Sequence, residues 1–283
     1  MTDNKALKLN EEDRDRLTKY RDMVDYGSSL LADTTMSGGR LSPKQRYLVL
    51  VFTAVNNYAE GIFTLCNAFR PESAMVLLRS LVEAYINTAY LLSHNSNNRL
   101  LLVYTEDCFY AKGLIGEIIT FYNKYPTLRP NGEGYKQENL QQLIGQHNKI
   151  LDDYSKKLKE DLSSHKKFKQ KHGEIVDLLE RAKIADKRFK KGSFEYNYLM
   201  VYRYFSEYAH LSLKGMSHFF KQTDNGLVGT SSQSSEINNI VMTAYFMYLF
   251  FLEKLKYYNL LPNLKISIFQ KQMGEIFRDF KVV

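Results

Sequence analysis

Residues 72–92 read ESAMVLLRSLVEAYINTAYLL, and this stretch indicates most clearly which fold the chain adopts. Apolar residues occur on nearly every side of a helix with about 3.6 residues per turn, so we predict a helix that is buried on most sides. Arg79, Glu83 and Asn87 recur every four residues and would form one polar strip along it. A helix of this kind requires other helices around it.

The rest of the chain also has the composition of helices. Its 283 residues include only 5 prolines and 15 glycines. We therefore predict an all-α, multi-helix bundle that forms a single domain over residues 1–283, with a basic helical excursion at about 136–191. Residues 126–134 are interpreted as a linker and residues 222–235 as a mobile loop. Apolar spacing predicts helices at about 11–32, 43–69, 72–92, 98–125, 136–190 in two or three pieces, 194–213, 236–259 and 264–280.

The N-terminal residues and the longest apolar run indicate where the protein resides. Residues 1–33 are dense in charge and lack the layout of a secretory signal. The run at 240–252 is shorter than the roughly 20 residues that a bilayer span needs. We expect a cytoplasmic protein that does not associate with membranes. Cys66 and Cys108 have no Cys/His cluster at zinc spacing around them, so we predict neither a metal nor a cofactor.

A second polar strip is expected on the helix at 194–213. Arg203, Glu207 and His210 fall within a narrow sector of its surface, with Ser206 at the edge of that sector. The apolar face expected beside this strip is formed by Leu199, Tyr202, Phe205, Ala209 and Leu213. The strip should therefore border the core, and we treat its four residues as candidate catalytic residues.

An arginine and a histidine two turns apart are suited to a phosphodiester. His210 would transfer protons to and from a ribose 2′-hydroxyl or a leaving oxygen. Arg203 would hold the phosphate through a two-pronged hydrogen bond. The alternative is structural: Arg203 forms an ordinary ion pair with Glu207, and His210 favours the helix C-terminus because its positive form suits the dipole there.

Two interpretations are open for the strip on residues 72–92. In one, the strip faces the Arg203 strip, so that Glu83 orients Arg203 or His210 and Arg79 adds a second phosphate contact. In the other, Arg79 and Glu83 form a buried pair that only determines helix register.

The net charge of +8 is concentrated in one segment. Between Lys156 and Lys191 there are 13 Lys and Arg residues against 6 Asp and Glu, whereas the rest of the chain has 26 against 25. Such a segment is typical of a surface that binds nucleic acid, and equally of a solvated helix pair. The candidate RNA-binding residues are Lys166, Lys167, Lys169, Lys171, Lys187, Arg188, Lys190 and Lys191.

The segment from Arg203 to His210, Arg-Tyr-Phe-Ser-Glu-Tyr-Ala-His, has the form Arg, six residues, His. It resembles the signature of the HEPN superfamily of helical proteins. Arg79-Ser-Leu-Val-Glu83, followed later by Tyr202 and this segment, is similar to an uncharacterised all-helical bacterial family with R-x-x-x-E and Y-R-x-x-S-x-x-x-H elements. Arg79, Glu83 and Tyr202 are accordingly candidate supporting residues.

The resemblance implies a HEPN-like bundle that dimerises and cuts RNA without a metal, with Arg203 binding phosphate and His210 as acid and base. We therefore expect an endoribonuclease of toxin or phage-defence type, acting as a homodimer on RNA, with tRNA as one candidate substrate. A regulatory partner protein is a further expectation. The alternative is a non-catalytic helical binding or sensor module for an anionic ligand or a partner protein.

Overall fold

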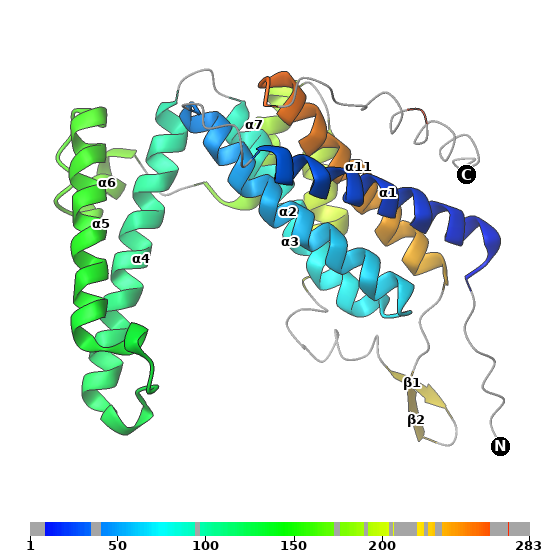
Figure 1. Ribbon diagram of the computed structural model, residues 1–283, viewed down its shortest axis with the longest axis horizontal. Helices are drawn as coiled ribbons and strands as arrows, with labels where there is room; N and C mark the ends of the chain where they lie inside the picture. Colours follow the sequence, from blue (N-terminus) through cyan, green and yellow to red (C-terminus); the bar gives the residue numbers. More distant parts are fainter. Residues whose placement is uncertain are drawn as a thin grey trace. The chain divides into compact units, whose positions relative to one another are not determined.

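Helices make up nearly all of the described chain, so the prediction of an all-α, multi-helix bundle is confirmed. Figure 1 presents the computed structural model. It describes residues 9–34, 41–93, 97–172, 176–189, 192–203, 206, 220–223, 226–229, 234–260 and 271.

The chain divides into two compact units. Unit 1 consists of Met1–Ser93 and Leu178–Val283, and unit 2 consists of His94–Asp177. We expected a single domain with an excursion at about 136–191. Unit 2 differs from that excursion at both ends, because it takes in the helix before residue 136 and ends before the last basic helix.

Unit 1 contains the helices that surround the core (Figure 1). They are α1 (Glu11–Thr34), α2 (Pro43–Asn67), α3 (Pro71–Leu92), α7 (Leu178–Phe189), α8 (Ser193–Asn197), the π-helix η3 (Tyr198–Arg203) and α11 (Ser234–Tyr257). Helix α2 packs against α3 and α11, and α1 packs against α2 and α11. On its other sides α3 contacts α7 and η3. This arrangement explains why residues 72–92 are apolar on most sides.

Local sequence signals mark where α2 and α3 begin. The side chain of Ser42 accepts a hydrogen bond from the Gln45 backbone, and the Gln45 side chain accepts one from the Ser42 backbone. This capping box satisfies two backbone donors that the helix itself leaves free. Pro43 and Pro71 occupy first helical positions, where the missing N–H costs nothing. The predicted start of α2 is confirmed.

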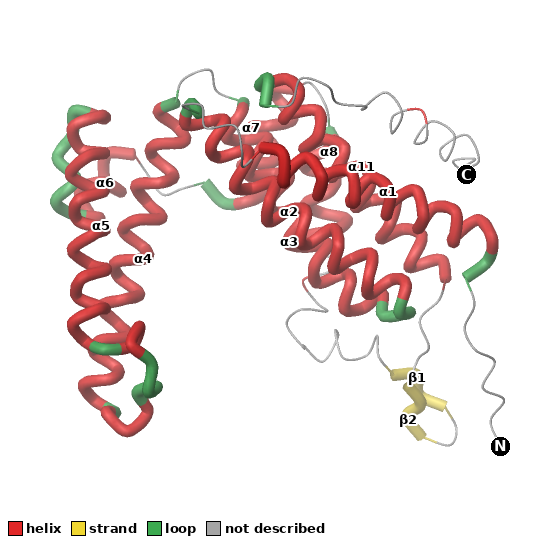
Figure 2. The backbone as a smooth tube through the Cα atoms, in the orientation of Figure 1, coloured by secondary structure: helices red, strands yellow, loops and turns green. Residues whose placement is uncertain are grey.

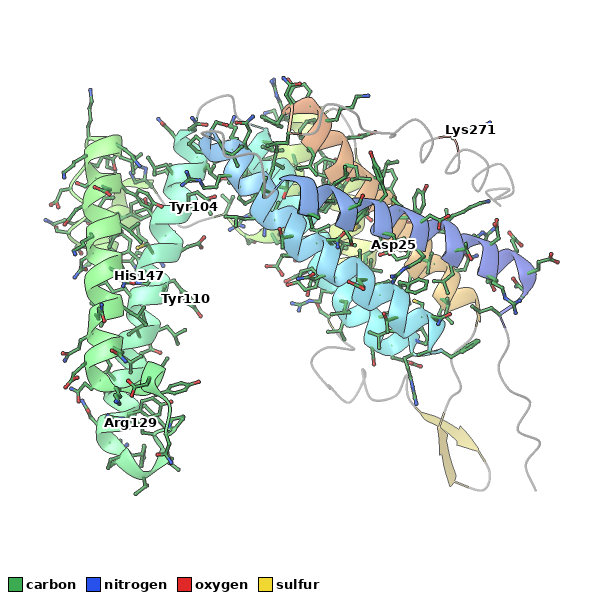
Figure 3. All side chains as sticks on the ribbon, in the orientation of Figure 1. Asp25, Tyr104, Tyr110, Arg129, His147 and Lys271 are labelled. Atoms are coloured by element: carbon green, nitrogen blue, oxygen red, sulfur yellow. The ribbon has the colours of Figure 1, made fainter. Side chains whose placement is uncertain are left out.

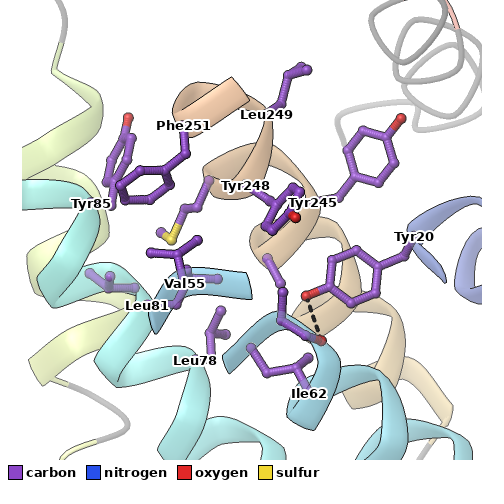
Figure 4. Packing of buried hydrophobic residues seen from close by; sticks show 14 of the residues in the cluster. Tyr20, Val55, Ile62, Leu78, Leu81, Tyr85, Tyr245, Tyr248, Leu249 and Phe251 are labelled. Carbon is purple, nitrogen blue, oxygen red and sulfur yellow. Dashed lines mark hydrogen bonds between the residues drawn. The ribbon is translucent and has the colours of Figure 1, made fainter. Parts of the chain in front are cut away.

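The core of unit 1 is lined by large side chains from α1, α2, α3 and α11 (Figure 4). Most of the apolar run at 240–252 is buried there. The Tyr20 hydroxyl donates to the carbonyl oxygen of Ala59 at 3.1 Å, drawn as a dashed line in Figure 4. The Tyr248 hydroxyl donates to the side-chain oxygen of Asn56, whose amide donates to Ser28 Oγ at 2.8 Å. These bonds satisfy polar groups that burial would otherwise penalise.

Unit 2 is a helical hairpin. Its elements are α4 (Asn98–Lys124), the 3-10 turns η1 (Pro126–Leu128) and η2 (Glu133–Tyr135), α5 (Gln137–Leu158) and α6 (His165–His172). Helices α4 and α5 pack side by side, and the expected linker at 126–134 lies at the turn between them (Figure 2). Phe168 of α6 is buried with Cys108, Phe109, Leu151 and Leu162.

Part of the expected loop at 222–235 is a β-hairpin, which corrects that prediction. Strands β1 (Phe220–Thr223) and β2 (Gly226–Gly229) pair antiparallel, with Phe220 opposite Gly229 and Thr223 opposite Gly226 (Figure 2). Asp224, Asn225 and Gly226 are residue types that favour tight hairpin turns, so the sequence did contain a signal. Apart from Lys271, the expected helix at 264–280 lies outside the described residues.

Two of the described helices, α2 and α3, are long and apolar enough to cross a membrane by length and composition alone. Half of the apolar window of α3 and a third of that of α2 are buried inside the protein. Core helices of soluble proteins meet the same criteria, so the length and composition of α2 and α3 do not distinguish a membrane-spanning helix from a core helix.

Candidate functional site

Arg79 joins α3 to the segment that begins with η3. Its Nε donates to Ser206 Oγ at 3.0 Å, and its Nη2 donates to the Tyr202 hydroxyl at 2.9 Å. The guanidinium carbon also lies 4.5 Å from the centre of the Tyr202 ring. Arg79 is half-buried, so these contacts replace part of its hydration. The structure thus brings together one residue of the first motif and two of the second.

The segment that receives Arg79 is not a regular α-helix. Tyr198–Arg203 form a π-helix, although the apolar spacing predicted one α-helix over 194–213. Ser206 Oγ donates to the carbonyl oxygen of Tyr202 at 2.7 Å, and the rings of Tyr198 and Tyr202 stack with centres 5.5 Å apart. Short π-helical turns are uncommon and are frequent at functional sites.

Glu83 does not pair with Arg79, so the buried Arg79–Glu83 pair predicted as one alternative is wrong. Glu83 is exposed, and no ion pair joins it to Arg79, both residues being described. The neighbouring helices leave this side of α3 open to solvent, while Arg79 is drawn toward Tyr202 and Ser206. Asn87, the last residue of the strip, instead accepts a hydrogen bond from Arg181 Nη1 of α7 at 2.5 Å.

Arg203 is exposed on a face of the segment that also carries apolar side chains. Leu199 is 41% exposed and Met200 is 56% exposed, so the prediction that Leu199 belongs to the core-facing side is wrong. The buried side is formed by Phe194, Asn197 and Val201, with Tyr198 and Tyr202 packed at its edge. This spacing of three to four residues turns positions 199, 200 and 203 toward solvent.

Glu207 and His210 lie outside the described residues, as do Phe205, Ala209 and Leu213 of the expected apolar face. The strip predicted from Arg203 to His210 can therefore be described at Arg203 and Ser206 only. Of these two, Ser206 is held by Arg79 and by the Tyr202 carbonyl, whereas Arg203 forms no ion pair with any described residue.

The basic residues are divided between the two units. Lys166, Lys167, Lys169 and Lys171 belong to α6 in unit 2, whereas Lys187 and Arg188 are exposed on α7 in unit 1. Lys190 and Lys191 lie outside the described residues. The segment of 36 residues that appeared continuous in sequence, from Lys156 to Lys191, is thus contributed by two bodies.

Carboxylates accompany three of the four lysines of α6. Lys167 Nζ lies 3.4 Å from Asp161 Oδ2, Lys171 Nζ lies 3.1 Å from Glu160 Oε1, and Lys169 Nζ lies 3.8 Å from Glu106 Oε1. Neighbouring carboxylates cancel much of the field that lysines would present to a polyanion. The pair with Glu106 has no signal in the sequence because Glu106 lies on α4, far from the basic segment, whereas Glu160 and Asp161 lie within that segment and were counted only as charges.

Two histidines bind α6 to the rest of unit 2. His172 Nε2 lies 2.5 Å from Glu160 Oε2, and His165 Nε2 lies 2.9 Å from Glu106 Oε1 while its ring stacks on Phe109. Burial alone would raise the pKa of Glu160, but hydrogen bonds from His172 and Lys171 lower that pKa below its ordinary value. These contacts indicate a structural role for α6 in unit 2.

Asp186 and Arg181 are polar residues of unit 1 that the sequence did not single out. Asp186 is buried and accepts hydrogen bonds from the backbone N–H groups of Phe194 at 3.1 Å and Glu195 at 2.8 Å. It therefore caps the first turn of α8, which leads into η3. Arg181 and Asp186 were counted only as charges of the basic segment, since the contacts that distinguish them are tertiary.

Within the described part of the chain, no three His, Cys, Asp or Glu side chains come together as metal ligands would. The chemistry available at the described site is that of arginine: hydrogen-bond donation and positive charge. Arg79 donates its hydrogen bonds to Tyr202 and Ser206, whereas the guanidinium of Arg203 is exposed to solvent and could bind an anion.

Comparison with known proteins gives one result. No curated protein and no solved structure matches the chain significantly. A family model matches residues 45–227, well over half of the sequence, and this range includes both motif elements. The chain therefore belongs to the family of unknown function DUF5677.

Proposed function

We propose that the protein is a metal-independent endoribonuclease of toxin or phage-defence type, with a HEPN-like site made by Arg203 and His210. One observation carries the proposal: Arg79 is hydrogen-bonded to Tyr202 and Ser206, the residues on either side of Arg203 in the second motif. A segment held in this way presents an exposed guanidinium from a defined backbone. Such positioning is what phosphate binding and in-line chemistry require.

The residues of the second motif have different roles in the proposed reaction. His210 removes the proton of the ribose 2′-hydroxyl, whose oxygen attacks the phosphorus to form a 2′,3′-cyclic phosphate, and it then gives that proton to the 5′-oxygen as the bond from phosphorus to this oxygen breaks. Arg203 holds the phosphate and neutralises the charge that grows on it in the transition state. The Ser206 hydroxyl already donates to Tyr202 and accepts from Arg79, so Ser206 positions the segment and does not act on RNA. Glu207 serves as an ion-pair partner of Arg203.

A homodimer is part of the proposal. Tyr196, Leu199 and Met200 are exposed, and they precede Arg203 by seven, four and three residues. Arg203 is exposed as well, and neighbouring exposed apolar side chains are typical of an interaction surface. A second copy that covered this face would bring two Arg203 residues close to one symmetry axis. We propose a cytoplasmic dimer that does not use a membrane and is controlled by a partner protein.

The test is cleavage of labelled tRNA and total RNA in excess chelator. We expect the wild-type protein to cut, and we expect His210→Ala and Arg203→Ala to lose at least about 100-fold in rate. Arg46→Ala removes another exposed arginine, from α2, and should cut like the wild type. Circular dichroism shows whether all variants keep their helices. RNA that stays intact, or equal cleavage by all four proteins, would contradict the proposal.

A second candidate is a non-catalytic binding or sensor module for an anionic ligand or a partner protein. It is favoured by the lysines of α6, which lie beside carboxylates and so contribute little to RNA binding. In this case the wild-type protein would bind labelled RNA or another anion through Arg203, and His210→Ala would bind equally well. Binding without cleavage by both proteins would therefore select this candidate.

A further inference from the structure

Unit 1 contains a cavity that shares no residue with the motifs. It lies between the N-terminal half of α1 and the C-terminal end of α2, and its volume is about 340 Å³. Leu17 of α1 and Phe63 of α2 supply apolar wall, together with Phe69 beyond the end of α2. The volume is at the lower end of the range for small-molecule sites, so it suits a compact ligand.

Phe69 lines the cavity from a strained backbone position. Its φ of 54° is in the left-handed region that helix ends usually assign to glycine. A residue with a large side chain there costs of order 1 kcal/mol, and such strain is often retained at ligand sites. Backbone bonds hold the turn, since Phe69 N donates to Cys66 O at 3.1 Å and Arg70 N to Leu65 O at 2.8 Å.

Two arginines from α1 also line the cavity, and they differ in how far their charge is compensated. Arg21 Nε donates a hydrogen bond to Asp25 Oδ2 at 2.9 Å, and Arg21 Nη1 lies 3.9 Å from Glu60 Oε1. The guanidinium carbon of Arg21 lies 4.9 Å from the centre of the Phe63 ring. Asp25 is labelled on α1 in Figure 3. Arg14 is seven residues earlier, on the same helix face, and its side chain pairs with no carboxylate among the described residues.

We propose that this cavity binds a small organic carboxylate with an aromatic or otherwise apolar body. The rings of Phe63 and Phe69 contact the apolar body of the ligand, and the guanidinium of Arg14 binds its carboxylate. Arg21 holds the Phe63 ring in place by stacking on it. Charge complementarity selects the occupant, because Arg14 is the cation at the cavity whose charge the described residues leave uncompensated. Helix α1, which carries both arginines, precedes the family match at 45–227, whereas Phe63 and Phe69 lie within it, so the cavity combines residues from both parts of the chain.

The experiment uses the full chain and two ligands of the same shape, 2-naphthoate and its neutral amide, in titrations followed by ligand-observed NMR. We expect saturable binding of 2-naphthoate and weaker binding of the amide. Arg14→Gln should weaken naphthoate about tenfold, the loss of one charge-assisted hydrogen bond, and leave the amide unchanged. Arg46→Gln removes the same charge from an exposed position on α2 outside the cavity and should bind like the wild type.

Three results would overturn the proposal: no saturable binding of 2-naphthoate, equal affinity for acid and amide, or equal weakening by Arg14→Gln and Arg46→Gln. A conservative second variant, Phe63→Leu, tests the aromatic wall and should weaken both ligands. Because neither arginine belongs to the motif site, RNA cleavage by Arg14→Gln should equal that of the wild type. The outcome is therefore independent of the proposed ribonuclease.

Discussion

Arg79 is the residue through which two distant motif segments meet. Arg79→Met removes the donors that bind Tyr202 and Ser206 but keeps most of the side-chain volume. We expect the free energy of unfolding to fall by about 1–2 kcal/mol, because these half-buried acceptors lose a charged partner. Urea denaturation followed by circular dichroism measures this change.

Arg203→Met is the matched control for Arg79→Met. Arg203 is exposed and forms no ion pair with a described residue, so its replacement should change stability by less than about 0.5 kcal/mol. If both variants lose the same stability, Arg79 has no special role in holding the segment.

Gly27 of α1 lies directly against the side chain of Tyr248 of α11. A Cβ atom there would lie 1.7 Å from the Tyr248 hydroxyl oxygen and 3.0 Å from Asn56 Oδ1. Gly27→Ala must therefore displace a buried hydrogen-bonded pair, and we expect it to cost at least about 2 kcal/mol. At Gly61 the nearest atom is the mobile end of Leu77, at 2.6 Å, so Gly61→Ala should cost much less. Thermal unfolding of the two variants side by side would refute this order if Gly61→Ala melted lower.

At the scale of elements, η3 carries apolar side chains on an exposed face, and packing within the bundle does not explain why these side chains are apolar. Met200→Glu places a charge on this face beside Leu199, whereas Leu50→Glu does the same on an exposed position of α2. If the face is a dimer interface, Met200→Glu should shift the protein to monomer, because a charge buried without a partner is costly. Light scattering after gel filtration measures the mass, and Leu50→Glu should stay dimeric. A wild-type protein that is already monomeric contradicts the proposed dimer.

Helix positions were predictable because their signals are local. Ser42 with Pro43 marks the start of α2 within a few residues of sequence, and the apolar period continues to its end. The π-helix and its contacts were not predictable, since Arg79 and Ser206 are 127 positions apart and no short window relates them. The same reason applies to Glu83, whose exposure depends on which side of α3 the other helices leave open.

At the scale of the whole molecule, the buried cysteine thiol and tyrosine hydroxyl groups of the core determine how the free energy of unfolding responds to alkaline pH. Burial raises the pKa of the Cys66 thiol from 9.0 to about 12, and it raises the pKa of Tyr85 from 10.0 to about 12. Burial raises the pKa values of Tyr20, Tyr245 and Tyr248 as well. A raised folded pKa means that the native state binds more protons than the unfolded state above about pH 9. Stability should therefore be level below that pH and fall steadily up to about pH 12. Urea midpoints that stay constant across this range would contradict the expectation.

The division of basic residues between two units leads to a test of how the whole protein binds RNA. Lys187 and Arg188 are exposed on α7, and no ion pair joins them to a described residue. Lys167 and Lys171 of α6 are also exposed but lie 3.4 and 3.1 Å from carboxylates. Replacing either pair by alanine removes two positive charges, so the two double variants have the same net charge.

A lysine that is already paired releases few counterions when RNA binds, because its charge is balanced within the protein. The α7 double variant should therefore weaken RNA binding more, and it should reduce the slope of log affinity against log salt by about 1.4, as two lost phosphate contacts predict. The α6 double variant should change that slope by less than half as much. Fluorescence anisotropy with labelled RNA over a range of salt concentrations measures both slopes. Equal slopes would mean that only net charge matters, whereas a larger effect at α6 would assign RNA binding to unit 2 and separate it from the motif residues of unit 1.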